Sequence, residues 1–373
     1  MERKKYMEKK YLPSVLTNYP IFGLGYRSYW KLGNIVQAEV SKEYSLNVML
    51  AQQSAREIER TKRSFKEVIE SASESAQKVG LTRPWGSDGD HLRNEKEVTI
   101  AAESGCTHFT YDLSDALNKN KKDLIDKIKL FYDLTCQLRG KENFTSEISL
   151  DETESITDLK YVSDLMDELK NKKIEITEIA PHFPGYFEKA IDYYYKTENN
   201  KRIKDLKDFT NYLEEITKLS RRYGFKISVH SGSDKFSIYP IIAKVLKKDF
   251  HLKTAGTWYL EELKIVAKYD LDLFNEIYKV SYENYNMAKA TYHITCNTGN
   301  IPDIHNTDSQ TMVSLLESNA GNDDLRQLLH VTYGTILTSP DLSKRMESVL
   351  KVNITDYNKV LKAHIVRHVT DFL

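Results

Sequence analysis

The segment GSDGDHL places two carboxylates and an imidazole close together, at Asp88, Asp90 and His91. Carboxylates can take and return protons and an imidazole nitrogen can bind a metal, so this spacing suits acid–base or metal-assisted chemistry. In SEISLDE, strand alternation would put Glu147 and Asp151 on one face. A buried carboxylate without a partner is costly, so this pair requires a metal, an arginine or a shared proton. The alternative for GSDGDHL is an ordinary polar turn.

A second chemical segment is VHSGSDKFSIYP, in which His230 would end a strand. The small residues after it could bind an anion through backbone amides at the start of a helix. His251 ends the next expected strand, so histidines from three separate segments could meet. This pattern is typical of an open nitrogen and oxygen metal site, and the alternative for His230 is a satisfied core histidine. We interpret His108, His364 and His368 as surface or helix-packing residues.

These segments belong to an alternation of short β-like runs and longer amphipathic stretches. The expected strands lie at residues 45–54, 85–92, 106–115, 144–152, 174–183, 225–233 and 249–257, with a weaker candidate at 328–334. Strands that alternate with helices of about 10–15 residues indicate βαβ units and a parallel sheet. The pattern predicts an α/β fold, a (β/α)8 TIM-barrel-like architecture with extra C-terminal helices. An open doubly wound sheet is the alternative, but no GxGxxG turn follows an early strand.

The chain is expected to form one continuous architecture. Glycine and proline number 15 and 8, and no linker rich in glycine or serine interrupts the sequence. We expect residues 1–44 to form an N-terminal extension and residues 45–373 to form the barrel with its C-terminal helical part. The chemistry of a TIM barrel lies where its strands end, and polar side chains occupy that place here in successive units. The sequence therefore predicts an enzyme.

The composition excludes several functional classes. The 373 residues carry 54 Lys and Arg against 54 Asp and Glu, and this balance does not favour nucleic-acid binding. No run approaches the roughly 20 apolar residues of a membrane span, and no apolar signal segment follows the basic start. The three cysteines lack the spacing of a zinc site or a disulfide framework. We expect a cytoplasmic protein that acts on a small molecule and could form a homo-oligomer.

The chain resembles the bacterial tagaturonate epimerases in the order and content of its motifs. The matching segments are QQSAREIERT, GSDGDHL, FTYDLSD, SLDETES, KISVHSGSDKFSIYP, FHLKTAGTWYLEE, LHVTYG and AHIVRHV. The resemblance runs from about Leu46 to the C-terminus. It implies a metal-dependent, TIM-barrel-like enzyme that interconverts tagaturonate and fructuronate, two keto-hexuronates, in hexuronate breakdown.

The resemblance also implies roles for individual residues: a proton acceptor and donor at Asp90 and Glu147, and metal ligands at His91 and His230. The expected catalytic residues are Asp90 and Glu147, with Glu57 as the alternative if either assignment fails. The expected ligands of a divalent cation (Zn, Mn, Ni, Co or Fe) are His91, Glu188, His230 and His251. The expected substrate-binding residues are Ser54, Arg56, Thr110 and Lys253.

The sequence departs from the family pattern at two positions. Lys31 stands in YWKLG where an arginine is usual, and His182 replaces another arginine before PGYFEK. Both changes remove planar guanidinium groups suited to binding a carboxylate. We also expect this chain to lack an N-terminal segment that the family has.

The implied reaction constrains the mechanism. Tagaturonate and fructuronate differ at a carbon β to the ketone, whose hydrogen that carbonyl does not acidify, so simple enolisation cannot invert it. We expect retro-aldol cleavage, rotation of the aldehyde and re-addition, with a Lewis acid on the ketone and two carboxyl groups that move the hydroxyl proton. A metal-dependent aldolase that releases its fragments is one alternative. A non-catalytic sugar-binding barrel is another.

Overall fold

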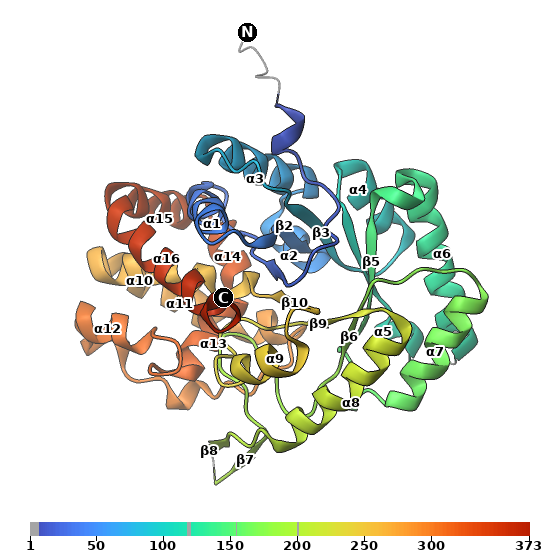
Figure 1. Cartoon of the computed structure of the whole chain (residues 1–373). Coiled ribbons are helices and arrows are strands. Elements are labelled where there is room, and N and C mark those ends of the chain that lie inside the picture. The colour runs from blue at the N-terminus through green and yellow to red at the C-terminus, as the bar shows by residue number, and fades with distance from the viewer. Residues whose placement is uncertain (1–6, 118–120, 154, 200) are drawn as a thin grey trace.

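The computed structural model describes residues 7–117, 121–153, 155–199 and 201–373. Eight parallel strands close into a barrel in the order β1, β10, β9, β6, β5, β4, β3, β2 (Figure 1). Their bounds are β1 (Ile21–Gly23), β2 (Asn47–Ser54), β3 (Gly86–Leu92), β4 (His108–Asp112), β5 (Thr145–Leu150), β6 (Glu178–Pro181), β9 (Lys226–Val229) and β10 (Phe250–Lys253). The predicted (β/α)8 TIM-barrel-like fold is confirmed.

Alternation along the strands places polar side chains inside the barrel and apolar side chains outside it. On β4, His108 and Thr110 contact polar groups of other strands across the barrel interior. The residues between and after them, Phe109 and Tyr111, belong to the hydrophobic core outside the barrel, where Tyr111 packs on Phe131. A period of two is what a strand with one interior face requires. The same period therefore gives the barrel a polar interior.

The amino-terminal end of the barrel is filled by a small apolar cluster. Leu16, Ile21 and Met49 are buried together, and Tyr19 packs against them. The Tyr19 hydroxyl donates a hydrogen bond to Glu178 at 2.8 Å, which joins this cluster to the polar interior above it. The filled end leaves the carboxyl ends of the strands as the open side of the barrel.

Helices surround the strands, and their ends follow local sequence signals. In α3 (Phe65–Val79), Ser64 accepts the backbone N–H of Glu67, and the Glu67 carboxylate accepts the backbone N–H of Ser64. This capping box starts the helix, and Gly80, with φ of +67°, ends it. The other helices that follow strands are α1 (Leu32–Glu43), α2 (Ala55–Thr61), α4 (Glu95–Ser104), α5 (Ser114–Leu117), α6 (Lys121–Arg139), α7 (Leu159–Asn171), α8 (Lys207–Tyr223), α9 (Tyr239–Leu246) and α10 (Trp258–Tyr269).

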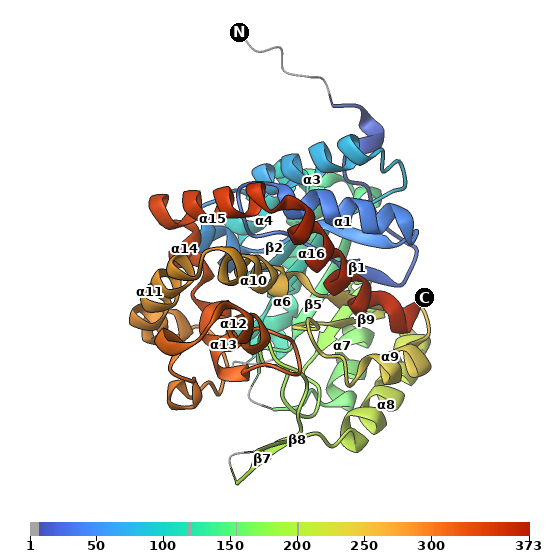
Figure 2. The same cartoon turned by 90° about the vertical axis from the view of Figure 1, so that its left-hand side faces the viewer.

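The remaining helices form a C-terminal layer along one side of the barrel (Figure 2). They are α11 (Leu271–Lys289), α12 (Ser309–Leu315), α13 (Asp323–Val331), α14 (Tyr333–Leu337), α15 (Pro340–Val352) and α16 (Ile354–Val369). Helix α16 packs on α1 and α10, and α14 packs on α2. A short hairpin, β7 (Lys196–Glu198) with β8 (Lys201–Ile203), projects at the bottom of the view in Figure 1. Within the described ranges, no helix is both long and apolar enough to cross a membrane.

Two sequence expectations about the elements require correction. The barrel begins with β1, before residue 45, because β1 pairs with both β10 and β2. With three residues, β1 is too short to show an alternating pattern. The weak strand candidate at 328–334 is helical and lies in α13 and α14. Asn322 caps α13 by accepting the backbone N–H of Leu325, and the apolar run that follows is a buried helix segment.

Helix α10 carries a buried carboxylate, Glu262, that is surrounded by neutral donors. It accepts hydrogen bonds from the Tyr26 hydroxyl, from Ser28 Oγ at 2.8 and 3.0 Å and from Trp30 Nε1 at 3.3 Å. Burial raises the pKa of Glu262 to about 7, although these hydrogen bonds act in the opposite direction. Glu262 thereby links the segment before α1 to α10.

We expect Glu262→Gln to reduce the dependence of stability on pH. Because the folded-state pKa of Glu262 lies above its ordinary value of 4.5, its favourable contribution is complete below that value and is lost as the pH rises through about 7. The loss amounts to about 3 kcal/mol in the wild type and should vanish in the variant. Urea unfolding of both proteins at about pH 5 and pH 8 measures the difference. Equal losses in the two proteins would contradict this assignment.

Candidate metal centre and active site

Three side chains from different strands converge at the open end of the barrel. His91 lies on β3, Asp151 follows β5 and His230 follows β9. Asp151 Oδ1 is 3.8 Å from His91 Nε2 and 3.1 Å from His230 Nδ1, and the two imidazole rings are 4.8 Å apart. The candidate ligand atoms of this group, the mouth cluster, all lie within 4.8 Å of one another. One metal ion could bridge such a spacing.

The other ring nitrogen of each imidazole contacts a carboxylate behind it. His91 Nδ1 is 3.0 Å from Asp90 Oδ1, and His230 Nε2 bonds Glu147 Oε1. His230 Nδ1 is buried and makes no hydrogen bond among the described residues, although Asp151 Oδ1 lies 3.1 Å from it. Carboxylates that bond the outer nitrogen of a histidine fix its tautomer and free the inner nitrogen for a metal. The orphaned nitrogen and the two supporting carboxylates therefore fit a metal at the mouth cluster.

The electrostatics of the mouth cluster favour a positive charge. Burial alone would lower the pKa of both histidines, but neighbouring carboxylates raise that of His91 to about 10 and that of His230 to about 9. For Asp151, burial acts in the raising direction and is outweighed by His230 and His91, which hold its pKa below its ordinary range. A bound dication would supply the positive charge that protons supply otherwise.

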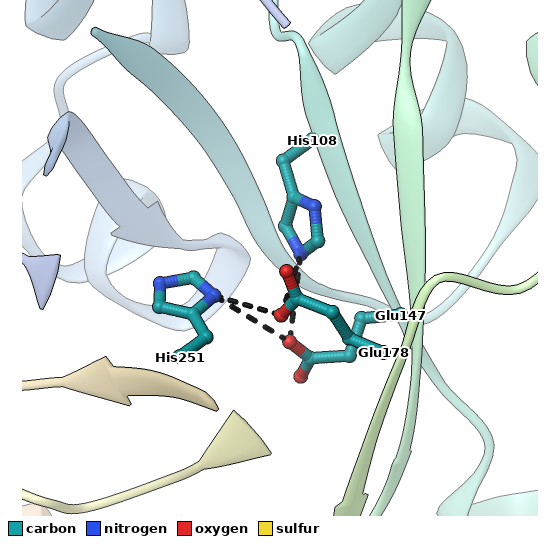
Figure 3. A group of neighbouring side chains, drawn as sticks. All are labelled: His108, Glu147, Glu178 and His251. Atoms are coloured by element: carbon teal, nitrogen blue, oxygen red, sulfur yellow. Dashed lines mark hydrogen bonds and ion pairs between the residues drawn. The ribbon is translucent and has the colours of Figure 1, made fainter. Parts of the chain in front are cut away.

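A second group, the deep cluster, lies nearer the filled end of the barrel and consists of His108, Glu147, Glu178 and His251 (Figure 3). His108 Nε2 is 3.4 Å from Glu147 Oε2 and 3.7 Å from Glu178 Oε2. His251 Nδ1 is 2.8 Å from Glu178 Oε2 and 4.0 Å from Glu147 Oε2. Glu147 connects the deep cluster to the mouth cluster, because its other carboxylate oxygen bonds His230.

In the deep cluster the carboxylates favour a proton on His108, and His251 Nε2 is buried without a hydrogen-bond partner among the described residues. Burial acts against a charged imidazole, but Glu178, Asp88 and Glu147 raise the pKa of His108 to about 9. All four of its side chains are fully buried, and none of them lines either of the two cavities described below. A catalytic metal needs an open coordination position, and the mouth cluster, which borders a cavity, offers one. The interpretation of His108 as a surface or helix-packing residue was wrong.

Lys253 is the central cation of the barrel. Its Nζ lies 2.7 Å from Asp90, 3.0 Å from Asp88 and 3.2 Å from Glu147, and it donates to Thr110 Oγ1 at 2.7 Å. Burial opposes its charge, but Asp88, Asp90 and Glu147 raise the pKa of Lys253 well above its ordinary value. In return, Lys253 is the strongest influence that overcomes burial and lowers the pKa values of Asp90 and Glu147. The structure thus brings together four residues that the sequence predicts at the site: Asp90, Glu147, Thr110 and Lys253.

Two cavities adjoin these groups. The outer cavity, about 1050 Å³, is lined by residues that include Arg56, Asp151, Glu152, His182 and His230. In it, Arg56 Nη2 bonds both carboxylate oxygens of Glu152, at 3.0 and 3.2 Å. The inner cavity, about 60 Å³, is lined by Arg27, Gln52, Glu57, Lys189, Ala190, Ser231, Ser233, Lys253, Ala255, Gly256 and His330. Lys189 and Ser231 line both cavities, so the two spaces are neighbours.

Ser54 and Glu57 have a local structural role that their motif already encodes. Ser54 Oγ accepts the backbone N–H of Glu57 at 3.1 Å, and Glu57 Oε2 accepts the backbone N–H of Ser54 at 3.2 Å. This capping box begins α2. The other oxygen of Glu57 accepts from Arg27 Nε at 2.6 Å, and that pairing orients both side chains at the inner cavity.

Three other expected or unusual residues, Glu188, Lys31 and His182, are not members of the mouth cluster. Glu188 is not brought to the mouth cluster, because its carboxylate accepts from Tyr194 Oη at 2.7 Å and Gln327 Nε2 at 2.7 Å. Lys31 pairs with Glu74 at 2.6 Å on the surface. His182 lines the outer cavity, where its Nδ1 lies 3.0 Å from the backbone oxygen of Asp151.

A third acidic and imidazole group, Asp234 with His364 and His368, is structural. His368 Nε2 accepts the backbone N–H of Asp234 at 3.0 Å, and its Nδ1 donates to the backbone oxygen of His364 at 2.8 Å. Burial lowers the pKa of His368, so its ring is neutral. Both of its ring nitrogens already make hydrogen bonds, so His368 has no free lone pair for a metal. Arg326 pairs with Asp234. The group ties the loop after His230 to α13 and α16, so the expected helix-packing role of His364 and His368 is confirmed.

Comparisons with known proteins agree with the fold and with the motifs. The family model described as tagaturonate epimerase matches residues 3–133 and 122–372. Tagaturonate/fructuronate epimerase from Thermotoga maritima is 31% identical over 93% of this chain and 79% of its own length. A glycerol-complexed crystal structure of fructuronate-tagaturonate epimerase from Cohnella laeviribosi has a TM-score of 0.88 and 27% identity, and it covers 97% of this chain and 83% of that one. The native structure of that enzyme has a TM-score of 0.83.

The family match extends over nearly the whole chain, from the segment before β1 to α16. It includes the strands that carry the mouth cluster, the deep cluster and Lys253. The chain belongs to the tagaturonate epimerase family and is, by that membership, an isomerase of the hexuronate epimerase type.

Proposed function

We propose that this protein interconverts tagaturonate and fructuronate with a divalent metal bound by the mouth cluster. The observation that supports this proposal most strongly is the arrangement of His91 and His230. Each imidazole rests on a carboxylate and turns its other nitrogen toward Asp151 beside the outer cavity. Family membership supports the substrate class, and the spacing of the mouth cluster supports a metal beside the outer cavity.

Two imidazoles and a carboxylate form a donor set that suits Zn, Mn, Ni, Co or Fe. When bound, the metal would act as a Lewis acid toward the ketone and the neighbouring hydroxyl of the sugar acid. Asp90 and Glu147 hold the two imidazoles in the tautomer that leaves a lone pair for the metal. The Arg56–Glu152 pair lines the outer cavity, where a bound sugar would contact it.

For the chemical step, we propose the retro-aldol route. The bond between the carbons α and β to the ketone breaks as the β-hydroxyl loses its proton, which gives an enediolate and an aldehyde. The aldehyde then rotates, the bond forms again on its other face, and the proton returns to the new hydroxyl. No atom is gained or lost, so the reaction needs no co-substrate.

Proton movement is assigned to Asp90 and Glu147 acting with Lys253. Lys253 lines the inner cavity and contacts both carboxylates, so its ammonium group can relay the proton of the substrate hydroxyl to one of them in a single concerted step and remain charged. Thr110, which accepts a hydrogen bond from Lys253, keeps the ammonium in place. Glu57 also lines the inner cavity and is the alternative base.

We expect epimerisation in heavy water to leave the inverted carbon unlabelled. In the retro-aldol route the hydrogen on that carbon stays attached throughout, because the bond that breaks joins two carbons. Purified, metal-loaded protein should convert tagaturonate into fructuronate and back without added nicotinamide. Mass spectrometry and NMR of the recovered sugar acids measure the label.

Each other outcome identifies a different reaction. Stoichiometric deuterium on the inverted carbon would show direct deprotonation and overturn the retro-aldol route. Accumulation of three-carbon fragments without interconversion would show an aldolase. Tight binding of either sugar acid by metal-loaded protein, with no conversion, would show a binding protein.

A further inference from the structure

The inner cavity contains a buried histidine that nothing in the proposed chemistry uses. His330 of α13 is 1% exposed, and neither of its ring nitrogens has a hydrogen-bond partner among the described residues. Burial, together with the cations of Arg27, Lys189 and Arg326, holds the pKa of His330 well below its ordinary value. The ring is therefore neutral and presents one unpaired N–H group. Leaving a buried donor unpaired is costly, so this N–H calls for an acceptor from outside the chain.

The same cavity contains a cation whose charge is not balanced. Lys189 Nζ donates to Ser231 Oγ at 2.6 Å and forms no ion pair within 4.0 Å among the described residues, and it acts on the Glu152 carboxylate only at longer range. The other cations of the lining are paired, Arg27 with Glu57 and Lys253 with the interior carboxylates. Glu57, the carboxylate in the lining, is thus neutralised by Arg27. The unbalanced charge in the cavity is positive.

The space between these groups is open because the residue beside it, Gly256, has no side chain. A Cβ atom at Gly256 would lie 2.8 Å from His330 Cε1 and 3.5 Å from Arg27 Nη2. The Gly256 backbone oxygen accepts from Arg27 Nη1 at 3.1 Å, which holds the guanidinium against this gap. The Tyr333 ring, 4.0 Å from the guanidinium carbon, covers Arg27 from α14. The cavity, about 60 Å³, has room for a carboxylate group.

We propose that the inner cavity binds the carboxylate of the sugar-acid substrate, with Lys189 as its counter-charge and His330 as a neutral hydrogen-bond donor. This assignment rests on the proposed function. Lys189 and Ser231 border both cavities, so a substrate held here by its carboxylate extends toward His230 and Asp151. Lys189, together with His330 from the C-terminal layer, thereby determines that the enzyme acts on a sugar acid rather than on a neutral ketose.

The position of this subsite also suits retro-aldol chemistry. In a keto-hexuronate the ketone and the carboxylate lie toward opposite ends of the carbon chain. When the bond between the α and β carbons breaks, the carboxylate stays with the aldehyde fragment. If Lys189 and His330 hold the carboxylate, the aldehyde fragment stays bound while its aldehyde group rotates to present the other face.

The test compares two small probes that differ in the carboxylate alone, glycerate and glycerol. We expect glycerate to raise the melting temperature of the wild-type protein more than glycerol does at equal concentration. In Lys189→Met, the advantage of glycerate should disappear while the effect of glycerol stays unchanged. The matched control is Lys226→Met, which removes a lysine paired with Asp249 at the start of β9 and should keep the advantage of glycerate. An unchanged glycerate advantage in Lys189→Met overturns the proposal.

A second variant tests His330 by a signature that a structural role would not give. His330→Leu removes the unpaired ring nitrogens and fills the space with apolar atoms. We expect a higher melting temperature than the wild type without ligand, together with a weaker glycerate effect. A structural histidine would instead give a lower melting temperature and an unchanged glycerate effect, and that result overturns its role as a donor.

Kinetics separate this proposal from the proposed function. In Lys189→Met with its metal retained, KM for tagaturonate should rise by about 10- to 100-fold while kcat changes less, since a charged hydrogen bond to the bound carboxylate is lost. If the wild type fails to interconvert the sugar acids yet prefers glycerate through Lys189, the proposed reaction is wrong and the carboxylate subsite stands. If the wild type is active and Lys189→Met has normal KM and glycerate response, the subsite is wrong and the function stands.

Discussion

Replacing His230 with alanine should remove the metal and the epimerase activity while the barrel stays folded. The imidazole lies at the open end of the barrel, between Asp151 and Glu147, and outside the hydrophobic core. Its loss leaves His91 and Asp151, too few ligands to hold a dication tightly. Because Lewis-acid stabilisation is worth several kcal/mol, turnover should fall by about 10³-fold or more. Metal analysis per chain, circular dichroism and the interconversion assay measure the three quantities.

Two companion variants decide which cluster holds the metal. His251→Ala removes a side chain of the deep cluster and none of the mouth cluster, so it should retain one metal per chain, although it leaves Glu178 without its partner at 2.8 Å. His182→Ala removes an imidazole that lines the outer cavity without joining either cluster, and it should also retain the metal. Metal that is lost from His251→Ala and kept in His230→Ala would move the metal centre to the deep cluster.

Lys253→Met should cause the largest loss of stability of any single substitution in the barrel interior. Methionine matches the length of the lysine stem but leaves Asp88, Asp90 and Glu147 without their shared cation. Removing one partner from a buried ion pair costs about 3–5 kcal/mol, because the remaining charge stays buried and unpaired. Activity should be lost as well, since Lys253 links both proposed proton-transfer carboxylates to the inner cavity. Urea unfolding at neutral pH measures the free energy of unfolding.

The pH dependence of that loss has a definite sign. Lys253 holds the folded-state pKa values of Asp90 and Glu147 low, so these carboxylates contribute stability above their unfolded pKa values and lose it on acidification. Lys253→Met lacks this contribution, so the difference in stability from the wild type should shrink as the pH falls. A second substitution, Asp88→Asn, should restore part of the stability by removing one unpaired charge. Lys226→Met provides the control, because Lys226 is partly exposed and pairs with the half-exposed Asp249, so its loss should cost less.

The alternation of residue types predicted most of the fold. Strand β4 carries polar side chains at every second position with apolar side chains between them, and β5 does so from Glu147 onward. The sequence shows this pattern because each face of such a strand lies in one environment. The three-residue β1 has no such pattern, and its place in the barrel depends on pairing with β10, far along the chain. The candidate strand at 328–334 failed because a short apolar run fits a buried helix equally well.

The site was predictable where its residues end strands and not where packing brings them in. The segments GSDGDHL and VHSGSD pointed to His91 and His230, which the structure places side by side. The signal for His108 was present, because it alternates with Thr110 and Asp112 in one expected strand. No local signal marked His330, which lies on a helix and reaches the inner cavity through the packing of the C-terminal layer. Glu188 was an expected ligand whose neighbours, Tyr194 and Gln327, hold it elsewhere.

The pairing of β1 with β10 has a consequence for how the protein is made. Ile21 lies opposite His251 and Phe22 opposite Leu252, so the first strand to leave the ribosome gains its second neighbour when the last strand appears. At about 5–20 residues per second, synthesis of the intervening chain takes roughly 10–50 s. During that interval the nascent sheet has two open edges, which can pair with other chains. A slow stretch of translation between β2 and β10 should therefore reduce the yield of active enzyme, whereas a pause after Lys253 should leave it unaffected.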